Sequence, residues 1–191
     1  MSVAEYNRTR ALGVLILALF GVVLGSLLDG LHTHSGATEY THPWIWKMAV
    51  WVPPLFGGAS LAIGTTHADF DRRVGRAPRR FGWPSILLQI VLFSVTYWMS
   101  AYLPVSSATK LVLLLLAFAA IWAVFDRHWQ GIVLAILTAI VGCGVEASLV
   151  AAGKFRYTQP DMLGVALWLP ALYMNASVAV GNLGRKVLPG R

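Results

Sequence analysis

The sequence has 191 residues, of which 57% are hydrophobic and only 12% are charged. Soluble domains carry about 25% charged residues, so this chain has too few to cover a water-exposed surface, and its surroundings must be largely lipid. The net charge of +7 comes from basic residues between apolar segments, which favours anionic lipid headgroups over nucleic acid as partners. The single cysteine, Cys143, excludes an intrachain disulfide. The length predicts one domain over residues 1–191.

Six apolar segments follow one another along the chain, each close to the roughly 20 residues that span a bilayer. They cover residues 11–31, 47–66, 84–103, 108–125, 131–152 and 162–180. Backbone groups in lipid must be hydrogen-bonded within their own segment, and the alternating pattern of a barrel is absent, so helices are predicted. The first run is too long for the apolar core of a signal peptide and is predicted to be retained. The predicted fold class is therefore an all-α, polytopic membrane protein with a bundle of six transmembrane helices.

Lysine and arginine are divided unequally between the two sides of such a bundle. Eleven lie at the two termini and in the second and fourth loops, against four on the other side. The positive-inside rule then places both termini in the cytoplasm. The second loop is predicted to bind anionic lipid headgroups, with docking of a protein as the alternative. Its basic residues are Arg72, Arg73, Arg76, Arg79 and Arg80.

Two of the six segments carry small or helix-bending residues. The segment 131–152 has Ala135, Ala139 and Gly142 on one face, which favours close helix packing and predicts a central position in the bundle. The segment 47–66 contains the pair Pro53 and Pro54, which is expected to kink the helix. A kinked helix beside a helix of small residues predicts an internal cavity.

Asp29 and Glu146 are the acidic residues that lie most clearly inside apolar spans, both in the outer half. Such groups are costly in a membrane and usually face a bundle interior or water. The pair could form a shared polar pocket, bind a hydroxyl of a ligand or relay protons. Two simpler interpretations remain open: Asp29 contacts water at its helix end, and Glu146 is a neutral carboxyl group hydrogen-bonded to a neighbouring helix.

The remaining polar residues favour structural roles. His32, His34 and His67 are expected to be loop residues in water, because they form no complete tetrahedral ligand set, and no metal site or cofactor is predicted. Thr158, Pro160 and Asp161 indicate a helix start. Asp126 is interpreted as a turn residue, able to cap the next helix or pair with a neighbouring arginine. No catalytic arrangement is recognisable, so the chain is predicted not to be an enzyme.

Four stretches of the sequence resemble the insulin-induced gene protein family, Insig, and they occur in the order of that family. The first is Trp51, Pro53 and Pro54 with Gly57, Gly58 and Ala59; the second is Trp122, Phe125, Asp126 and Arg127 with Gly131; the third is Tyr157 to Asp161; the fourth is Trp168, Leu169 and Pro170 with residues 180–185. The family also has six membrane helices with both termini in the cytosol.

The resemblance implies a regulator without catalytic activity. Insig proteins lie in the endoplasmic reticulum membrane, bind oxysterol, retain the escort protein Scap and promote degradation of a reductase. Asp126 matches a family aspartate important for association with Scap, and Trp122 matches a neighbouring aromatic residue, so both are predicted to bind a partner. The chain departs from the family in its short tails, in the absence of lysine before Ala11 and in Leu55 and Phe56 at positions where cysteines are frequent. These departures favour a minimal homologue of prokaryotic origin, in the cell membrane, where a Scap-like partner is not required; a eukaryotic homologue would lie in the endoplasmic reticulum.

The favoured function is that of an Insig-like membrane protein with a cavity for an oxysterol or a diacylglycerol-like lipid, acting on lipid homeostasis through membrane partners. The predicted lipid-binding residues are Trp51, Pro54, Phe56, Gln89, Phe93, Gly142 and Glu146. For Gln89 an interhelical hydrogen bond is an equal alternative. The main alternative function is a small proton-coupled transporter that uses Asp29 and Glu146, although no inverted repeat is evident. A lipid-modifying enzyme and a purely structural partner protein are the remaining possibilities.

Overall fold

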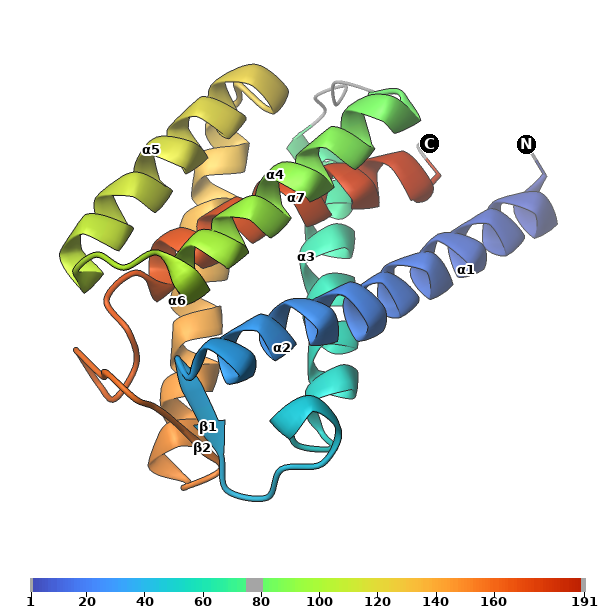
Figure 1. Ribbon diagram of the computed structural model, residues 1–191. Coiled ribbons are helices and arrows are strands. Elements are labelled where there is room, and N and C mark those ends of the chain that lie inside the picture. Colours follow the sequence, from blue (N-terminus) through green and yellow to red (C-terminus); the bar gives the residue numbers. More distant parts are fainter. Residues whose placement is uncertain (1, 75–80, 190–191) are drawn as a thin grey trace.

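The computed structural model describes residues 2–74 and 81–189 of the chain (Figure 1). The first membrane helix is built from α1 (Val3–Phe20), the π-helical turn η1 (Gly21–Gly25) and α2 (Ser26–Ser35). The other five are α3 (Val52–Val74), α4 (Trp83–Tyr102), α5 (Ser107–Phe125), α6 (Trp129–Ala151) and α7 (Leu169–Val187). The strands β1 (Thr38–Tyr40) and β2 (Phe155–Tyr157) and the 3-10 turn η2 (Ile45–Lys47) lie between them. The predicted all-α bundle of six helices is confirmed.

The predicted boundaries hold for α4, α5 and α6, each within two residues at either end. The second predicted segment is displaced, because α3 begins at Val52 instead of residue 47. Trp46 and Lys47 adopt positive φ angles of 51° and 63°, which are not helical, so the helix can begin only after them. Pro53 and Pro54 therefore occupy the first turn of α3, where proline is tolerated, and the expected kink in the helix interior was wrong.

The sixth segment is displaced further, from the predicted 162–180 to α7 at Leu169–Val187. Thr158, Pro160 and Asp161 do not start a helix, which corrects that prediction. Leu163 and Gly164 have positive φ angles of 56° and 78°, so the chain makes a tight turn. The Asp161 carboxylate accepts a hydrogen bond from the backbone N–H of Leu167 at 2.7 Å, and the helix begins only after this turn.

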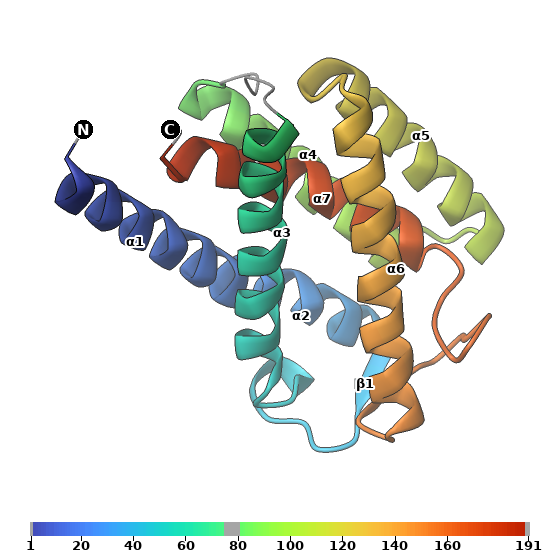
Figure 2. The same ribbon diagram turned by 180° about the vertical axis from the view of Figure 1, so that it is seen from behind.

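Length and composition mark four of the described helices as able to cross a membrane: the continuous span Val3–Ser35, α4, α5 and α6. The other two, α3 and α7, contain more polar residues, and α7 is also shielded by its neighbours. In α7 the buried positions include Asn175, Ser177 and Asn182, and they extend over most of the helix. Helix α7 crosses the middle of the bundle (Figures 1 and 2).

Helix α6 was predicted to be central, and this was wrong. Within its most apolar window only 17% of residues are buried, the lowest share among the four apolar spans. Its small-residue face is nevertheless a packing face: Ala135 and Ala139 are buried, and a side chain at Gly142 would collide with the ring of Tyr173 on α7. The small residues therefore bring α6 close to α7 on one side, while its other side faces lipid.

The first membrane helix changes to π geometry at η1, where it meets α3. A Cβ atom on Gly21 would collide with the Phe56 carbonyl group, and one on Gly25 would lie 2.5 Å from the Phe56 side chain. These two glycines therefore let the backbones approach closely. Turns of π-helix are frequent at functional sites, and this one places Phe56 between two cavities described below.

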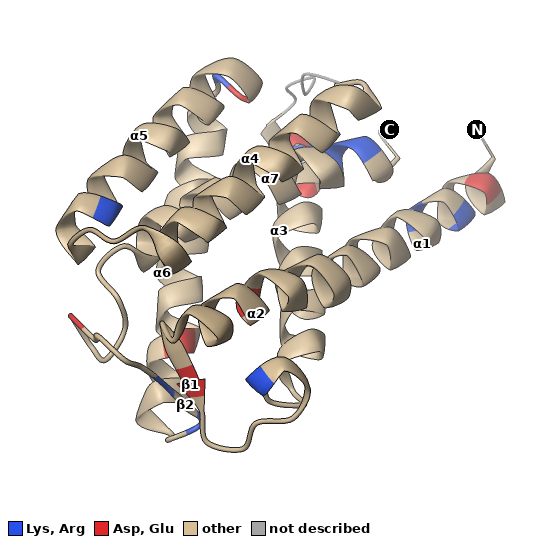
Figure 3. Ribbon diagram, viewed as in Figure 1, with Lys and Arg blue, Asp and Glu red and all other residues tan. Residues whose placement is uncertain are grey.

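Both chain ends lie at the same end of the bundle, as predicted (Figure 1). Arg72 on α3 donates to the Pro189 carbonyl oxygen at 2.8 Å and to Asp69 at 2.9 Å, and Arg10 on α1 pairs with Asp69 at 3.6 Å. Figure 3 shows that the basic residues lie close to the two ends of the bundle. Arg73 is exposed on this side. Of the five arginines predicted to bind headgroups, Arg76, Arg79 and Arg80 lie outside the described residues.

Candidate functional site

A cavity of about 510 Å³ lies between α3 and α6, with contributions from α2, α4, α7 and both strands. Its volume falls in the range of roughly 300–1,000 Å³ that is common for small-molecule sites. Most of its wall is apolar, because α3 and α6 face each other with aliphatic and aromatic side chains. These include Leu55, Phe56, Ala59, Ala62, Ile63, Leu134, Leu137, Val141, Val145 and Leu149.

The cavity reaches the lipid-facing surface between α3 and α6. Val141 lines it and is 63% exposed, and Leu137 and Val145 are lining residues that are also exposed. Gly58, on the α3 side, is exposed and has open space where a side chain would be. Figure 2 shows α3 and α6 upright on the same face of the bundle. A molecule dissolved in the bilayer could therefore enter from the side.

The outer end of the cavity is closed by the two-stranded sheet. β1 and β2 pair antiparallel, with Thr38 opposite Tyr157 and Tyr40 opposite Phe155. All four of these residues line the cavity. The pair between them, Glu39 and Arg156, is exposed and forms an ion pair at 2.5 Å. The sheet is therefore a lid with an aromatic inner face and a charged outer face.

Asp29 and Glu146 both line the cavity beneath this lid, so the sequence-based expectation of a shared polar pocket agrees with their positions. Tyr40 of β1 donates to Asp29 Oδ2 at 2.9 Å, and Tyr157 of β2 donates to Glu146 Oε2 at 2.5 Å. Tyr173 of α7 donates to Glu146 Oε1 at 2.6 Å. Asp29 is buried, which corrects the alternative of a carboxylate in water.

The two lid tyrosines remain phenols, because burial and the neighbouring carboxyl groups raise the pKa of Tyr40 and of Tyr157. Each can therefore act as a hydrogen-bond donor at neutral pH. Tyr157 and Tyr173 use this capacity to occupy both oxygens of the Glu146 side chain. These tyrosines were missed by sequence reasoning, since none stands in a motif with the acid that it contacts.

Two of the histidines expected in water are buried instead. His32 Nε2 lies 2.9 Å from Ser100 Oγ, and its ring stacks on Tyr97 with 4.4 Å between centroids. His67 Nε2 lies 2.9 Å from Ser177 Oγ. Both histidines line the cavity, near its opposite ends. Among the described residues, no group of three or more metal-binding side chains comes together.

Five of the seven predicted lipid-binding residues line the large cavity, namely Trp51, Pro54, Phe56, Gly142 and Glu146. Phe93 lies instead on a second, much smaller cavity of about 60 Å³ beside η1, which shares Phe56, Tyr97 and Glu146 with the first. Gln89 lines neither cavity. It is fully buried and its Oε1 accepts a hydrogen bond from Asn182 at 2.7 Å, which agrees with the interhelical alternative.

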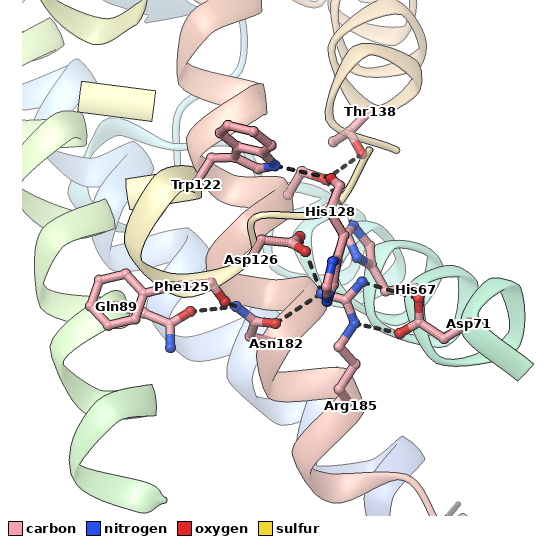
Figure 4. A network of polar contacts seen from close by, with 11 residues as sticks. His67, Asp71, Gln89, Trp122, Phe125, Asp126, His128, Thr138, Asn182 and Arg185 are labelled. Atoms are coloured by element: carbon pink, nitrogen blue, oxygen red, sulfur yellow. Dashed lines mark hydrogen bonds and ion pairs between the residues drawn. The ribbon is translucent and has the colours of Figure 1, made fainter. Parts of the chain in front are cut away.

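A second polar cluster lies at the inner end of the bundle (Figure 4). Arg185 of α7 donates to Asp71 Oδ2 at 2.6 Å, to Asp126 Oδ2 at 3.2 Å and to Asn182 Oδ1 at 2.9 Å. Asn182 also donates to Gln89 and to the Phe125 carbonyl oxygen. This cluster, here called the inner network, joins α3, α4, α7 and the turn between α5 and α6.

Asp126 lies inside the protein, with only 2% of its surface exposed. Burial raises the pKa of its carboxyl group, and the Arg185 guanidinium opposes this shift. A side chain at Gly131 would collide with the carboxylate, so glycine is required there. Trp122 supports the same turn by donating from Nε1 to the His128 carbonyl oxygen at 3.1 Å. Asp126 and Trp122 thus shape the α5–α6 turn from within.

These features define a helical membrane protein with a cavity that opens toward lipid and is polar at its outer end. Comparison with known proteins identifies this class. The model of the insulin-induced protein (INSIG) family matches residues 12–188, and the chain belongs to this family.

The relatives are similar over nearly the whole chain. Insulin-induced gene 1 proteins from Cricetulus griseus and from Homo sapiens are each 33% identical over 182 residues, which is 92% of this chain and 70% and 65% of those proteins. The crystal structure of MvINS, a mycobacterial Insig homologue from Mycobacterium vanbaalenii, superposes with a TM-score of 0.83 at 26% identity, covering 92% of this chain and 93% of that one. The protein is therefore an integral membrane protein of the Insig type.

Proposed function

We propose that this chain binds a neutral lipid, a sterol or a diacylglycerol-like molecule, in the cavity between α3 and α6. The observation that carries the proposal is the shape of the cavity: it is open to the bilayer beside Val141 and covered by the β1–β2 lid on the outer side. A ligand that partitions into lipid can reach it, whereas a water-soluble ligand meets the lid. The apolar walls would bury the hydrocarbon, and the few polar groups at the outer end would orient the head.

The proposed lining residues differ in their tasks. Trp51, Pro54, Phe56 and Gly142 supply apolar surface or space along the large cavity, and Glu146 fixes its polar end. Phe93 would contribute through the small cavity behind Phe56. Gln89 supports the position of α7 through Asn182 and is not proposed to touch the ligand.

We further propose that the protein acts by association with membrane partners and not by catalysis. The α5–α6 turn supports this, because it presents Arg127 and Trp129 outward while Asp126 holds it from inside. Trp122 and Asp126 would then control partner binding by setting the shape of the turn. The partner is a Scap-like protein only in a eukaryotic cell. Anionic lipid headgroups are proposed to bind Arg72 and Arg73 on the same side.

The proton-coupled carrier remains a second candidate, since Asp29 and Glu146 do line one cavity. It predicts that Glu146→Gln abolishes flux in proteoliposomes while the protein stays folded. The lipid-binding proposal instead predicts that the wild-type protein shows no flux and that Glu146→Gln changes the amount of lipid that the purified protein retains.

The test is mass spectrometry of the lipids that remain bound after purification in mild detergent, compared with the bulk membrane. Strong enrichment of one sterol or diacylglycerol-like species is expected. A bound-lipid profile equal to that of the membrane would contradict the proposal.

A further inference from the structure

The hydrogen-bonding groups beneath the lid are unequally satisfied. Both carboxylate oxygens of Glu146 are occupied, one by Tyr157 and the other by Tyr173. Asp29 accepts a hydrogen bond only at Oδ2, from Tyr40. Its second oxygen, Oδ1, has no partner among the described residues, although Asp29 is almost completely buried and lines the cavity.

A second group without a hydrogen-bond partner among the described residues lines the same cavity. Tyr97 lines the cavity and is only 7% exposed, and its ring is held between the His32 ring and the edge of Phe93. No hydrogen bond joins its hydroxyl group to any residue that the structure describes. Thr38 Oγ1, on the inner face of the lid, is likewise buried without a partner. The Thr38 atom is fully buried, whereas Asp29 and Tyr97 are buried residues that line the cavity. Polar groups of buried residues are nearly always hydrogen-bonded, so three without a partner among the described residues at the same end of a cavity indicate a ligand.

The combination of these groups matches one kind of head. Asp29 Oδ1 accepts a hydrogen bond, and the Tyr97 hydroxyl can donate one. A free alcohol both donates and accepts, so it satisfies the two together. An ether or ester oxygen has no hydrogen to give to Asp29. No Lys or Arg is among the described lining residues, so a phosphate would face two carboxyl groups with no cation to balance it.

We propose that the outer end of the cavity is a receptor for a free, uncharged hydroxyl group on a lipid, with Asp29 Oδ1 as acceptor and the Tyr97 hydroxyl as donor. Glu146 is a positioning residue, because it holds Tyr157 and Tyr173 and offers no unoccupied oxygen. The inference rests on the proposed lipid binding and narrows its chemistry. Free sterols and diacylglycerols share such a hydroxyl group. Sterol esters and triacylglycerols lack it, and phospholipids carry a charged phosphate group in its place.

The test compares heads on a constant hydrocarbon skeleton. The purified protein in phosphatidylcholine nanodiscs is offered 1,2-dioleoylglycerol, its 3-O-methyl ether or dioleoyl phosphatidic acid, and bound lipid is counted by native mass spectrometry. A parallel set uses cholesterol and its methyl ether. The alcohol of at least one skeleton is expected to bind about tenfold more than its ether, because a site built around a hydroxyl group rejects the analogue that lacks the hydrogen. Phosphatidic acid is expected not to bind.

Asp29→Asn sharpens the test because it reverses the hydrogen-bonding direction. With Tyr40 still bonded to the amide oxygen, the amide N–H₂ group faces the cavity and can donate to an ether oxygen. Tyr97→Phe removes the donor, from which an alcohol oxygen and an ether oxygen can both accept, so it is expected to lower the binding of alcohol and ether alike. The alcohol-to-ether ratio is expected to fall toward one in Asp29→Asn. It should stay at the wild-type value in Glu39→Gln, a change of a similar kind on the outer face of the same lid.

The outcomes separate the two proposals. If neither alcohol binds to the wild-type protein, the lipid-binding function itself is contradicted and this inference fails with it. If alcohol and ether bind equally well, lipid binding stands and the hydroxyl receptor is overturned. A wild-type ratio that persists in Asp29→Asn, or alcohol binding that is unchanged in Tyr97→Phe, would also overturn it. Where Asp29→Asn does not fold, unchanged binding of the alcohol in Tyr97→Phe alone overturns the receptor.

Discussion

The two polar clusters of this bundle differ in how their charges are balanced. At the inner end, Arg185 lies between Asp71 and Asp126, and all three side chains are almost completely buried. At the outer end, Asp29 and Glu146 are held by tyrosines, and neither forms an ion pair with a described residue. One cluster contains its own cation, whereas the other consists of acids and hydroxyl groups around a cavity.

The difference separates the stability of the fold from its function. Charges buried with a partner hold helices in register, and removal of one partner leaves the others uncompensated. Polar groups around an open cavity can be completed by a ligand, so their replacement should change what binds more than whether the chain folds. Substitutions in the two clusters should therefore give opposite profiles of stability and lipid binding.

The largest loss of stability is expected from Arg185→Leu. This change leaves the carboxylates of Asp71 and Asp126 buried without a cation, at a cost of about 3–5 kcal/mol. The unfolding free energy in detergent, followed by helical circular dichroism during titration with denaturant, measures the effect. Glu146→Gln is the comparison and should cost less, since one tyrosine can still donate to the amide oxygen and the hydroxyl of the other can accept from the amide N–H₂ group. Equal losses in the two variants would erase the contrast between the clusters.

Asp126→Ala is expected to have the next largest effect, a loss of about 1–3 kcal/mol, because it removes one acceptor of Arg185 and the support of the α5–α6 turn. The protein should still fold, but its association with a membrane partner should weaken, as read from co-purification of that partner. Exposed Arg127→Ala leaves the inner network intact and is the matched control for charge on the same turn. Unchanged co-purification of the partner with Asp126→Ala would contradict the role of the turn.

A smaller energetic change is expected at the mouth of the cavity. Val141→Trp places a large ring where Val141 borders both the cavity and lipid, so retained lipid should fall about tenfold, or about 1.4 kcal/mol, with little change in unfolding. Ile140→Trp is a close control, because Ile140 is 64% exposed, similar to Val141 at 63%, and does not line the cavity. Equal lipid loss in both variants would place the entrance elsewhere.

The sequence predicts the features that depend on one helix at a time. Segment length and apolar content predict six helices, and the small residues of α6 indicate its packing face correctly. Features that depend on contacts between distant segments are missed. His32 and His67 resemble loop residues in the sequence because their serine partners are 68 and 110 positions away.

Contacts between distant segments also explain why the burial of α7 is not evident from the sequence and why its start was placed too early. Helix α7 resembles an ordinary span because its asparagines and Arg185 find partners only when α3 and the α5–α6 turn pack around it. Its start was placed too early because Pro160 and Asp161 are good helix-start residues, and the positive φ angles of Leu163 and Gly164 that delay the helix have no strong signal in the sequence.

The smallest effect is expected on the outer face of the lid. Arg156 and Glu39 pair directly across the two strands, but both are exposed, so Arg156→Ala should cost at most about 1 kcal/mol in unfolding free energy. The loss should decrease further at high salt, because exposed charges are screened. Bound lipid should not change, since the bonds from Tyr40 and Tyr157 to the acids hold the lid from its inner face. A large loss of lipid in Arg156→Ala would instead mean that the outer ion pair keeps the lid closed, and charge balance would then matter at the outer end as it does at the inner one.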